Sequence, residues 1–266
     1  MDFIRLYGSY VKMFLKSRME YRFSFFSGLI ANFYSYFITY TIFWVITKRF
    51  GTINGWNFQD MTLLCGMNLL AHSIAGMLFW YTVFHLEQEI TSGNLDSYLI
   101  RPMGLIKQMI CRRFGDTQLG QILVTLIFMV SALRKINYQM TVFSYIYLIL
   151  AVLGGVLILA GVMIILGSLS FWILRTDNLA NIVYYDIRTF INYPLSILPV
   201  YIKIALTYIL PYAMINYYPS LIILHKVQTT KEFVLGIFSP LIGVLIFLLS
   251  LFVFNRGLSR YSGSGS

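Results

Sequence analysis

The sequence contains little charge, and acidic residues are especially few. Only 11% of its 266 residues are charged, with ten Asp and Glu against twenty Lys and Arg, while 58% are hydrophobic. Uncharged runs of helical length result, among them 117–133 and 235–254. A helix needs about 20 such residues to cross a hydrocarbon core of ~30 Å. Because these runs lack the alternation of a half-buried strand, the sequence predicts membrane-spanning helices rather than a closed barrel.

Chemical motifs are also scarce. The two cysteines, Cys65 and Cys111, fall in a predicted span and in a predicted cytoplasmic segment, which disfavours a disulfide. The three histidines are far apart, and neither an H-E-x-x-H nor a G-x-S-x-G motif is present. The sequence also has no G-x-x-x-x-G-K-[ST] phosphate loop. We therefore expect no enzyme activity, no metal site and no cofactor bound by this chain.

The positive charge is best explained by the membrane. A net charge of +10 would suggest nucleic acid in a soluble protein, but no compact basic domain is available to bind it. Thirteen of the twenty Lys and Arg fall in segments 1–22, 85–115, 174–190 and 255–266. Positive residues favour the cytoplasmic side of a membrane. The distribution predicts that the N-terminus and the C-terminus are both cytoplasmic.

The order of apolar and polar stretches predicts an all-α polytopic membrane protein with a single transmembrane domain, 1–266. Segment 1–22 alternates apolar and basic residues and is typical of an amphipathic helix lying on membrane lipid. Region 199–224 contains three prolines and is expected to form broken or re-entrant helices. Six spans are predicted, at about 23–47, 61–84, 117–133, 142–174, 178–198 and 233–254.

The segment after the second predicted span has the most distinctive local pattern. Acidic residues, a Gly-Asn break and a Pro stop follow one another within 85–102. They predict a short helix across the cytoplasmic mouth of the bundle, able to fit a groove in a partner protein. An ordinary solvated loop is the alternative. The residues expected to make the contact are Glu87, Glu89, Gly93, Leu95, Asp96 and Arg101.

Several motifs together resemble the ABC-2 type permeases, in particular the six-span subgroup in which two permeases often accompany one ATPase. The match covers nearly the whole chain. It rests on Gly93-x-Leu95-Asp96-x-x-Leu99-x-Arg101-Pro102, Tyr193-Pro194-Leu195, Pro211-Tyr212-Ala213, Tyr217-Tyr218-Pro219 and the tail from Arg256 to Gly265.

The resemblance implies a fold like that of the type V exporters in a bacterial plasma membrane. Segment 1–22 would be the connecting helix, 85–111 the coupling segment seated in an ATPase subunit, and 199–224 the outward re-entrant region. It further implies a dimer with a second permease, identical or homologous. ATP and Mg would be bound by the partner ATPase, and spans two and five would line the route.

Polar residues in spans two and five are candidates for a substrate pathway. Asn68 and His72 are four residues apart and share one helix face, whereas Asp186 and Arg188 are two apart and do not. Hydrogen bonding between helices is the alternative role for each of them. The full set is Asn68, His72, Ser73, Tyr184, Tyr185, Asp186, Arg188 and Asn192.

The sequence therefore favours the permease subunit of an ATP-driven exporter of a drug-like, peptide or lipid-like substrate. Two other functions stay open. A membrane scaffold or sensor could recruit a cytoplasmic partner through the same segment. An ion-coupled secondary transporter would place charged groups at half-membrane depth, and Asp186 and Arg188 are the best residues for that role.

Overall fold

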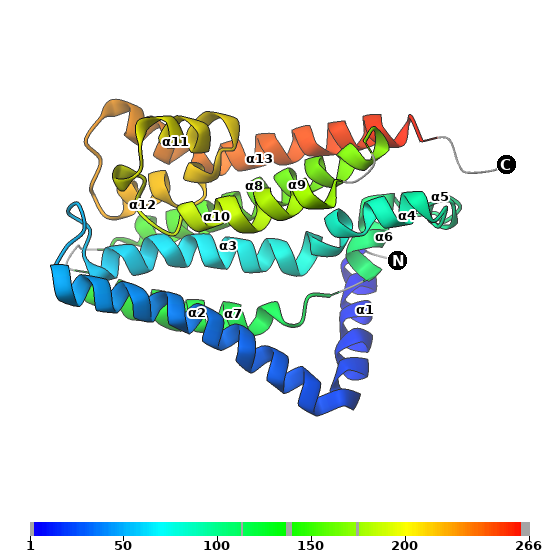
Figure 1. The fold of residues 1–266 in the computed structure, drawn as a ribbon, viewed down its shortest axis with the longest axis horizontal. Helices are drawn as coiled ribbons and strands as arrows, with labels where there is room; N and C mark the ends of the chain where they lie inside the picture. The colour runs from blue at the N-terminus through cyan, green and yellow to red at the C-terminus, as the bar shows by residue number, and fades with distance from the viewer. Residues whose placement is uncertain (1–2, 113, 137–139, 174–175, 262–266) are drawn as a thin grey trace.

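Five long helices lie side by side in the computed structural model, which describes residues 3–112, 114–136, 140–173 and 176–261 (Figure 1). They are α2 (Arg22–Phe50), α3 (Phe58–Phe84), α7 (Gln118–Lys135), α8 (Val142–Ser168) and α13 (Thr230–Leu258). The described residues form helices and loops, with one isolated bridge between Ile53 and Trp56. The predicted all-α fold is therefore confirmed. The tail motif is described only as far as Tyr261.

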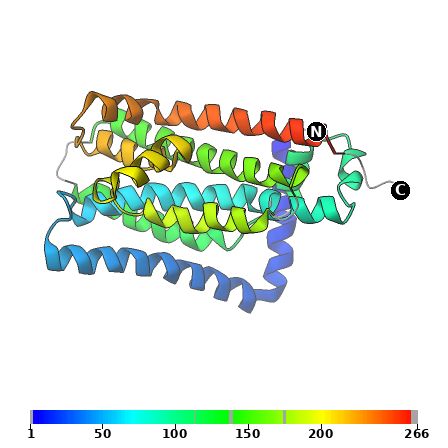
Figure 2. The same ribbon diagram turned by 45° about the horizontal axis from the view of Figure 1, so that its top comes forward.

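The bundle has a central helix with one helix pair on each side. α8 and α13 pack together on one side of α3, and α7 and α2 lie on the other (Figures 1 and 2). α3 is accordingly the most buried of the long helices, whereas the outer helices α2 and α13 are largely exposed. We call these pairs the α8–α13 layer and the α2–α7 layer.

Five helices in the described part of the chain are long and apolar enough to cross a membrane, one fewer than the six predicted spans. Each overlaps a predicted span. The difference lies at 178–198, where α9 (Asp177–Asn181), a π-helical turn (Ile182–Asp186) and α10 (Ile187–Phe190) follow one another. We call these 14 residues, 177–190, the π-containing run. At 1.5 Å per residue this run rises only about 21 Å. The chain then leaves the helix before Pro194, because a residue preceding proline disfavours helical geometry.

The proline-containing region 199–224 is broken, as the sequence predicts. α11 (Val200–Ile204) continues into a π-helical turn (Ala205–Ile209), and a 3-10 turn precedes α12 (Tyr217–Ile223). These short pieces cluster at one end of the bundle (Figure 1). Their position relative to a lipid bilayer, and hence their re-entrant character, stays a prediction.

Local sequence explains where the long helices begin and end. Asn57 and Asp60 form a reciprocal capping box at the start of α3, and Thr229 and Glu232 form another at the start of α13. α2 ends where Gly51 adopts a φ of +74°. These signals fix the helix ends independently of apolar content.

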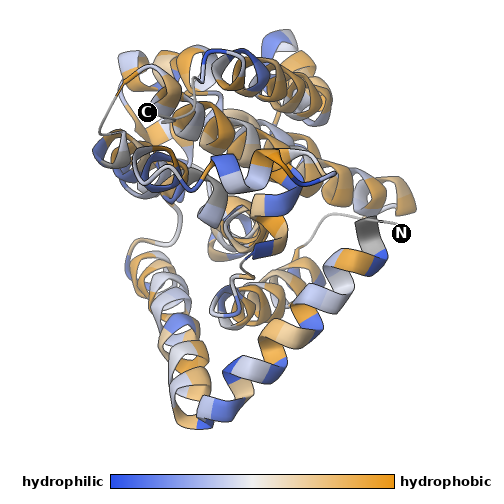
Figure 3. Ribbon diagram, turned by 90° about the vertical axis from the view of Figure 1, so that its right-hand side faces the viewer, coloured by the Kyte–Doolittle hydropathy of each residue, from blue (hydrophilic) through white to orange (hydrophobic). Residues whose placement is uncertain are grey.

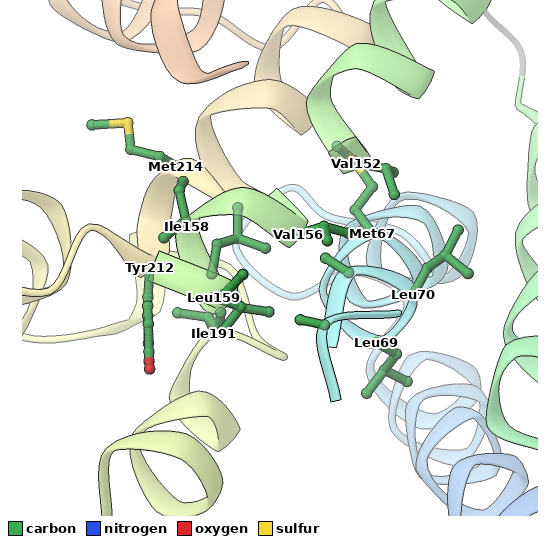
Figure 4. Packing of buried hydrophobic residues seen from close by; sticks show 14 of the residues in the cluster. Met67, Leu69, Leu70, Val152, Val156, Ile158, Leu159, Ile191, Tyr212 and Met214 are labelled. Carbon is green, nitrogen blue, oxygen red and sulfur yellow. The ribbon is translucent and has the colours of Figure 1, made fainter. Parts of the chain in front are cut away.

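The two helices of the α8–α13 layer approach each other closely at glycines. A Cβ atom placed on Gly154 would lie 2.6 Å from Cα of Pro240, and one on Gly161 would lie 2.9 Å from Cγ2 of Ile246. Small residues permit this kind of backbone contact between membrane helices. Towards α3, larger side chains fill the space. Figure 4 shows Met67 of α3 next to Val152 and Val156 of α8, and Leu159 of α8 next to Ile191.

α1 (Phe3–Arg18) crosses one end of the bundle nearly at right angles to α3 (Figure 1). Viewed onto that end, polar and apolar residues alternate along it (Figure 3). Arg5, Lys12 and Lys16 are exposed, as the predicted interfacial helix requires. Arg18 instead forms an ion pair with Asp116, at 2.9 Å between Nε and Oδ2. We call this end, where both ends of the described chain also lie, the α1 end.

Candidate functional site

The segment predicted to couple the chain to a partner lies at the α1 end of the bundle. It consists of α4 (Leu86–Thr91), α5 (Asp96–Leu99) and α6 (Leu105–Arg112) (Figure 1). Gly93 joins α4 to α5 with a φ of +73°, a conformation that favours glycine. The chain can therefore reverse sharply between two short helices instead of continuing α3 away from the bundle.

Glu89 attaches this segment to the end of α3. Its carboxylate accepts a hydrogen bond of 3.0 Å from the Tyr81 hydroxyl and forms an ion pair of 2.9 Å with Nη1 of Arg112. Glu89 is only 5% exposed, so the ion pair compensates a buried carboxylate. Leu95 is completely buried beside it in the segment. Both residues hold the segment in shape and do not present a surface to a partner.

Glu87 attaches the same segment to the start of α9. Its Oε2 accepts hydrogen bonds from the Thr176 backbone N–H at 2.7 Å and from the Thr176 hydroxyl at 3.2 Å. Thr176 directly precedes α9, where backbone N–H groups have no partner within the helix. The segment is therefore joined both to the central helix and to the π-containing run.

The exposed surface of the segment is formed by residues around the end of α5. Ile100 is 84% exposed and Leu99 is 48% exposed. Arg101 and Pro102 are exposed beside them, and Asp96 is partly exposed. Of the six residues predicted to make the contact, only Arg101 is fully available, while Leu99 and Ile100 add an apolar surface. We call 99–102 the docking tip.

A polar cavity of about 510 Å³ lies between the α2–α7 layer, α3 and the π-containing run. His72 and Arg188 line one part of it, near the middle of α3. Tyr81, Arg18 and Asp116 line the part at the α1 end. The cavity therefore extends from the middle of the bundle to the end that carries the coupling segment.

Arg188 is the charged residue at the inner part of this cavity. Its Nη1 donates a hydrogen bond of 3.2 Å to the Tyr36 hydroxyl on α2. Asp186 is exposed on the other side of the π-containing run, so the two charges do not face each other. The π-helical turn just before Arg188 is a feature often found at functional sites.

The remaining predicted pathway residues fall into two groups. His72 and Tyr185 line the cavity, and the His72 ring stacks on Tyr184 at 4.2 Å between centroids. By contrast, Nδ2 of Asn68 donates a bond of 2.7 Å to Oδ1 of Asn192. A further set of residues hydrogen-bonds α3 to neighbouring segments: Asn68 to Asn192, Ser73 to Gln121, and Tyr184 to the His72 carbonyl. Ser73 also donates to the Leu69 carbonyl within α3.

Several cavity residues were missing from the sequence-based prediction because they lie on spans one and three. Asn32 and Tyr36 on α2 are four residues apart and share a face, and Gln118 and Gln121 on α7 are three apart. This spacing of polar residues was the available signal. It was hidden in α2 by the many aromatic residues that face outward.

Cys111 lies outside the cavity, in α6. Burial raises the pKa of its thiol, which keeps it protonated and unreactive at neutral pH. No group of three His, Cys, Asp or Glu residues that could hold a metal ion occurs among the described residues.

An apolar helical bundle, a partly open polar cavity and a helical segment held against one end by hydrogen bonds are typical of a multi-pass membrane protein that transports a substrate. The sequence profile of the family described as "ABC-2 family transporter protein" matches residues 30–265. The chain therefore belongs to the ABC-2 transporter family, the permease component of ABC transporters, which partners in general with an ABC ATPase. Comparison with curated proteins and with solved structures gave no match.

Proposed function

We propose that this chain is the membrane-spanning permease subunit of an ATP-driven exporter. It would move a drug-like, peptide or lipid-like substrate out of the cytoplasm or inner leaflet. The observation that carries the proposal is the double attachment of the coupling segment. Glu89 joins it to α3, which lines the polar cavity, and Glu87 joins it to the start of the π-containing run, which lines the cavity further along at Tyr185 and Arg188.

In this mechanism the docking tip contacts a separate ATPase subunit, which binds ATP and Mg. Closure of the ATPases displaces the tip, and the two glutamates transmit the displacement to α3 and to the π-containing run. Because Arg188 lies on that run and His72 on α3, the motion changes the shape of the cavity. Alternating access then requires a second permease, identical or homologous, in a dimer.

The proposed topology has six passes through the bacterial plasma membrane. The π-containing run and the region 199–224 together make the fifth pass, with the latter as the outward re-entrant part. The docking tip, α1 and both termini are cytoplasmic. α1 lies along the inner membrane surface, where its exposed Lys and Arg contact anionic headgroups.

Purification from native membranes in mild detergent, followed by mass spectrometry, tests the partnership. We expect a stoichiometric ATPase with a phosphate loop, with or without a second six-span protein. ATP-dependent uptake of substrate into inside-out vesicles would then separate an exporter from a scaffold. A chain that purifies alone and shows no ATP-stimulated transport would overturn the proposal and favour a scaffold or an ion-coupled transporter.

A further inference from the structure

Arg188 is a cation that lines the cavity, and no carboxylate among the described residues pairs with it. Its Nε is buried and has no hydrogen-bond partner in the described part of the chain, while Nη1 reaches the neutral hydroxyl of Tyr36. The side chain as a whole is half-buried, and charged residues at half-membrane depth commonly mark substrate or ion pathways.

A second polar group at the same depth also lacks a partner. His72 is 2% exposed and lines the cavity, and its Nδ1 has no hydrogen-bond partner among the described residues. It stands near the middle of the 27-residue helix α3. Together with the Tyr36 hydroxyl, the inner part of the cavity therefore offers a guanidinium and polar groups that a ligand could satisfy.

The part of the cavity towards the α1 end is aromatic. Trp80, Tyr185 and Phe114 line it, and Nε1 of Trp80 donates a bond of 2.9 Å to the Tyr185 hydroxyl. Among the described residues that line the cavity, the other two charged ones, Arg18 and Asp116, neutralise each other as an ion pair. A volume of about 510 Å³ falls within the range of roughly 300–1,000 Å³ typical of sites for drug-sized ligands.

We propose that the cavity binds an amphipathic organic anion. Its carboxylate or phosphate group would contact Arg188 and Tyr36, and its apolar or aromatic body would lie against Trp80, Tyr185 and Phe114. The binding site stands on the cavity alone, and only the statement that this anion is the exported cargo rests on the proposed function. A small inorganic anion, which has no body to fill the aromatic part, is the competing ligand.

Isothermal titration calorimetry on the full-length chain in detergent tests the site with a matched pair of probes. The probes are N-(2,4-dinitrophenyl)-6-aminohexanoate and its neutral amide, which differ in charge and share one aromatic body. We expect the acid to bind about tenfold more tightly than the amide. Arg188→Gln should abolish this preference, and Arg188→Lys should keep part of it, because a charge-assisted hydrogen bond is worth more than a neutral one.

Arg256→Gln is the control, since Arg256 is an exposed arginine on α13 away from the cavity and should leave the acid affinity unchanged. Equal affinity for acid and amide in the wild-type chain would overturn the inference, as would an Arg188→Gln chain that still prefers the acid. Competition by inorganic phosphate as strong as that of the dinitrophenyl acid would also overturn it, in favour of a small-anion site.

The test depends neither on the folding of a single variant nor on the proposed function. If Arg188→Gln does not fold, as judged by size-exclusion chromatography, then the acid-to-amide ratio in the wild-type and Arg188→Lys chains carries the test. The titration needs neither ATP nor a partner. Failure to bind the acid would therefore leave the proposed function standing, whereas binding without ATP-driven transport would remove the proposed function and leave the site.

Discussion

The α8–α13 layer and the α2–α7 layer flank the same central helix but contact it differently. Glycines bring backbones together within both layers, Gly154 against Pro240 in the first and Gly120 against the Leu29 carbonyl in the second, but in the first layer apolar side chains also fill the space towards α3. In the second, the contact with α3 is interrupted by a cavity lined by Tyr36, His72 and Gln121. Dense packing resists deformation, whereas a polar cavity can change shape at lower cost. We infer that α3 and the α8–α13 layer move together as one rigid body and that the α2–α7 layer changes its position relative to them.

Two matched Gly→Ala substitutions test how much the close backbone contact in the α8–α13 layer contributes to stability. In Gly154→Ala the new Cβ would lie 2.6 Å from Cα of Pro240, so the α8 and α13 backbones must separate. Overpacking of this kind costs about 1–3 kcal/mol. In Gly28→Ala on α2 the new Cβ meets only Cγ2 of Thr117, at an ordinary 3.6 Å. We expect the thermal midpoint in detergent to fall by several degrees for Gly154→Ala and to stay unchanged or rise slightly for Gly28→Ala. Equal midpoints would mean that the close backbone contact between α8 and α13 does not contribute to stability.

The docking tip should affect partner binding without affecting stability. Ile100 is 84% exposed, so Ile100→Glu removes an apolar contact with the ATPase and exposes nothing new. We expect the affinity for the ATPase subunit to fall about tenfold, or ~1.4 kcal/mol, with no change in thermal midpoint. Surface plasmon resonance with the immobilised permease measures it. The control is Val142→Glu, an exposed position in the first turn of α8 at the opposite end of the bundle, where a carboxylate is compatible with the helix dipole. A comparable loss of ATPase binding there would argue against 99–102 as the docking surface.

Glu87→Gln should weaken transmission while leaving docking intact. The substitution keeps an oxygen that can accept from Thr176 but removes the charge, which reduces the strength of both hydrogen bonds. We expect ATP hydrolysis close to that of the wild type and substrate transport per ATP lowered about threefold, equivalent to roughly 0.7 kcal/mol. Parallel phosphate-release and vesicle-uptake assays give the ratio. Asp96→Asn, which changes a partly exposed carboxylate in the same segment, is the matched comparison. A fall in hydrolysis and transport together would instead point to lost docking.

The sequence predicted the long helices well because their signals are local. Lys48 and Arg49 mark the end of α2. The predicted starts of the second and sixth spans, 61 and 233, fall three residues inside α3 and α13, because the capping residues Asn57 and Thr229 precede the apolar runs. It failed to anticipate the short run at 177–190, because apolar content does not distinguish an α-helix from one containing a π-helical turn. Likewise, acidic residues such as Glu87 and Glu89 are typical of a surface that binds a partner. Only the tertiary structure shows that their carboxylates accept hydrogen bonds from Thr176, Tyr81 and Arg112. The cavity residues on α2 and α7 could be predicted only by knowing which helices face each other.

The ion pair that joins α1 to the α2–α7 layer should give the smallest effect. Arg18 and Asp116 contact each other at 2.9 Å, but the arginine side chain is 39% exposed and water weakens the attraction. Pairs of this kind contribute about 0.2–1 kcal/mol. A double-mutant cycle with Arg18→Gln, Asp116→Asn and the combined variant, followed by denaturant unfolding in detergent, should therefore give a coupling energy within that range. A value of several kcal/mol would mean that α1 is rigidly fastened to the start of α7, and the α2–α7 layer could then move only together with the interfacial helix.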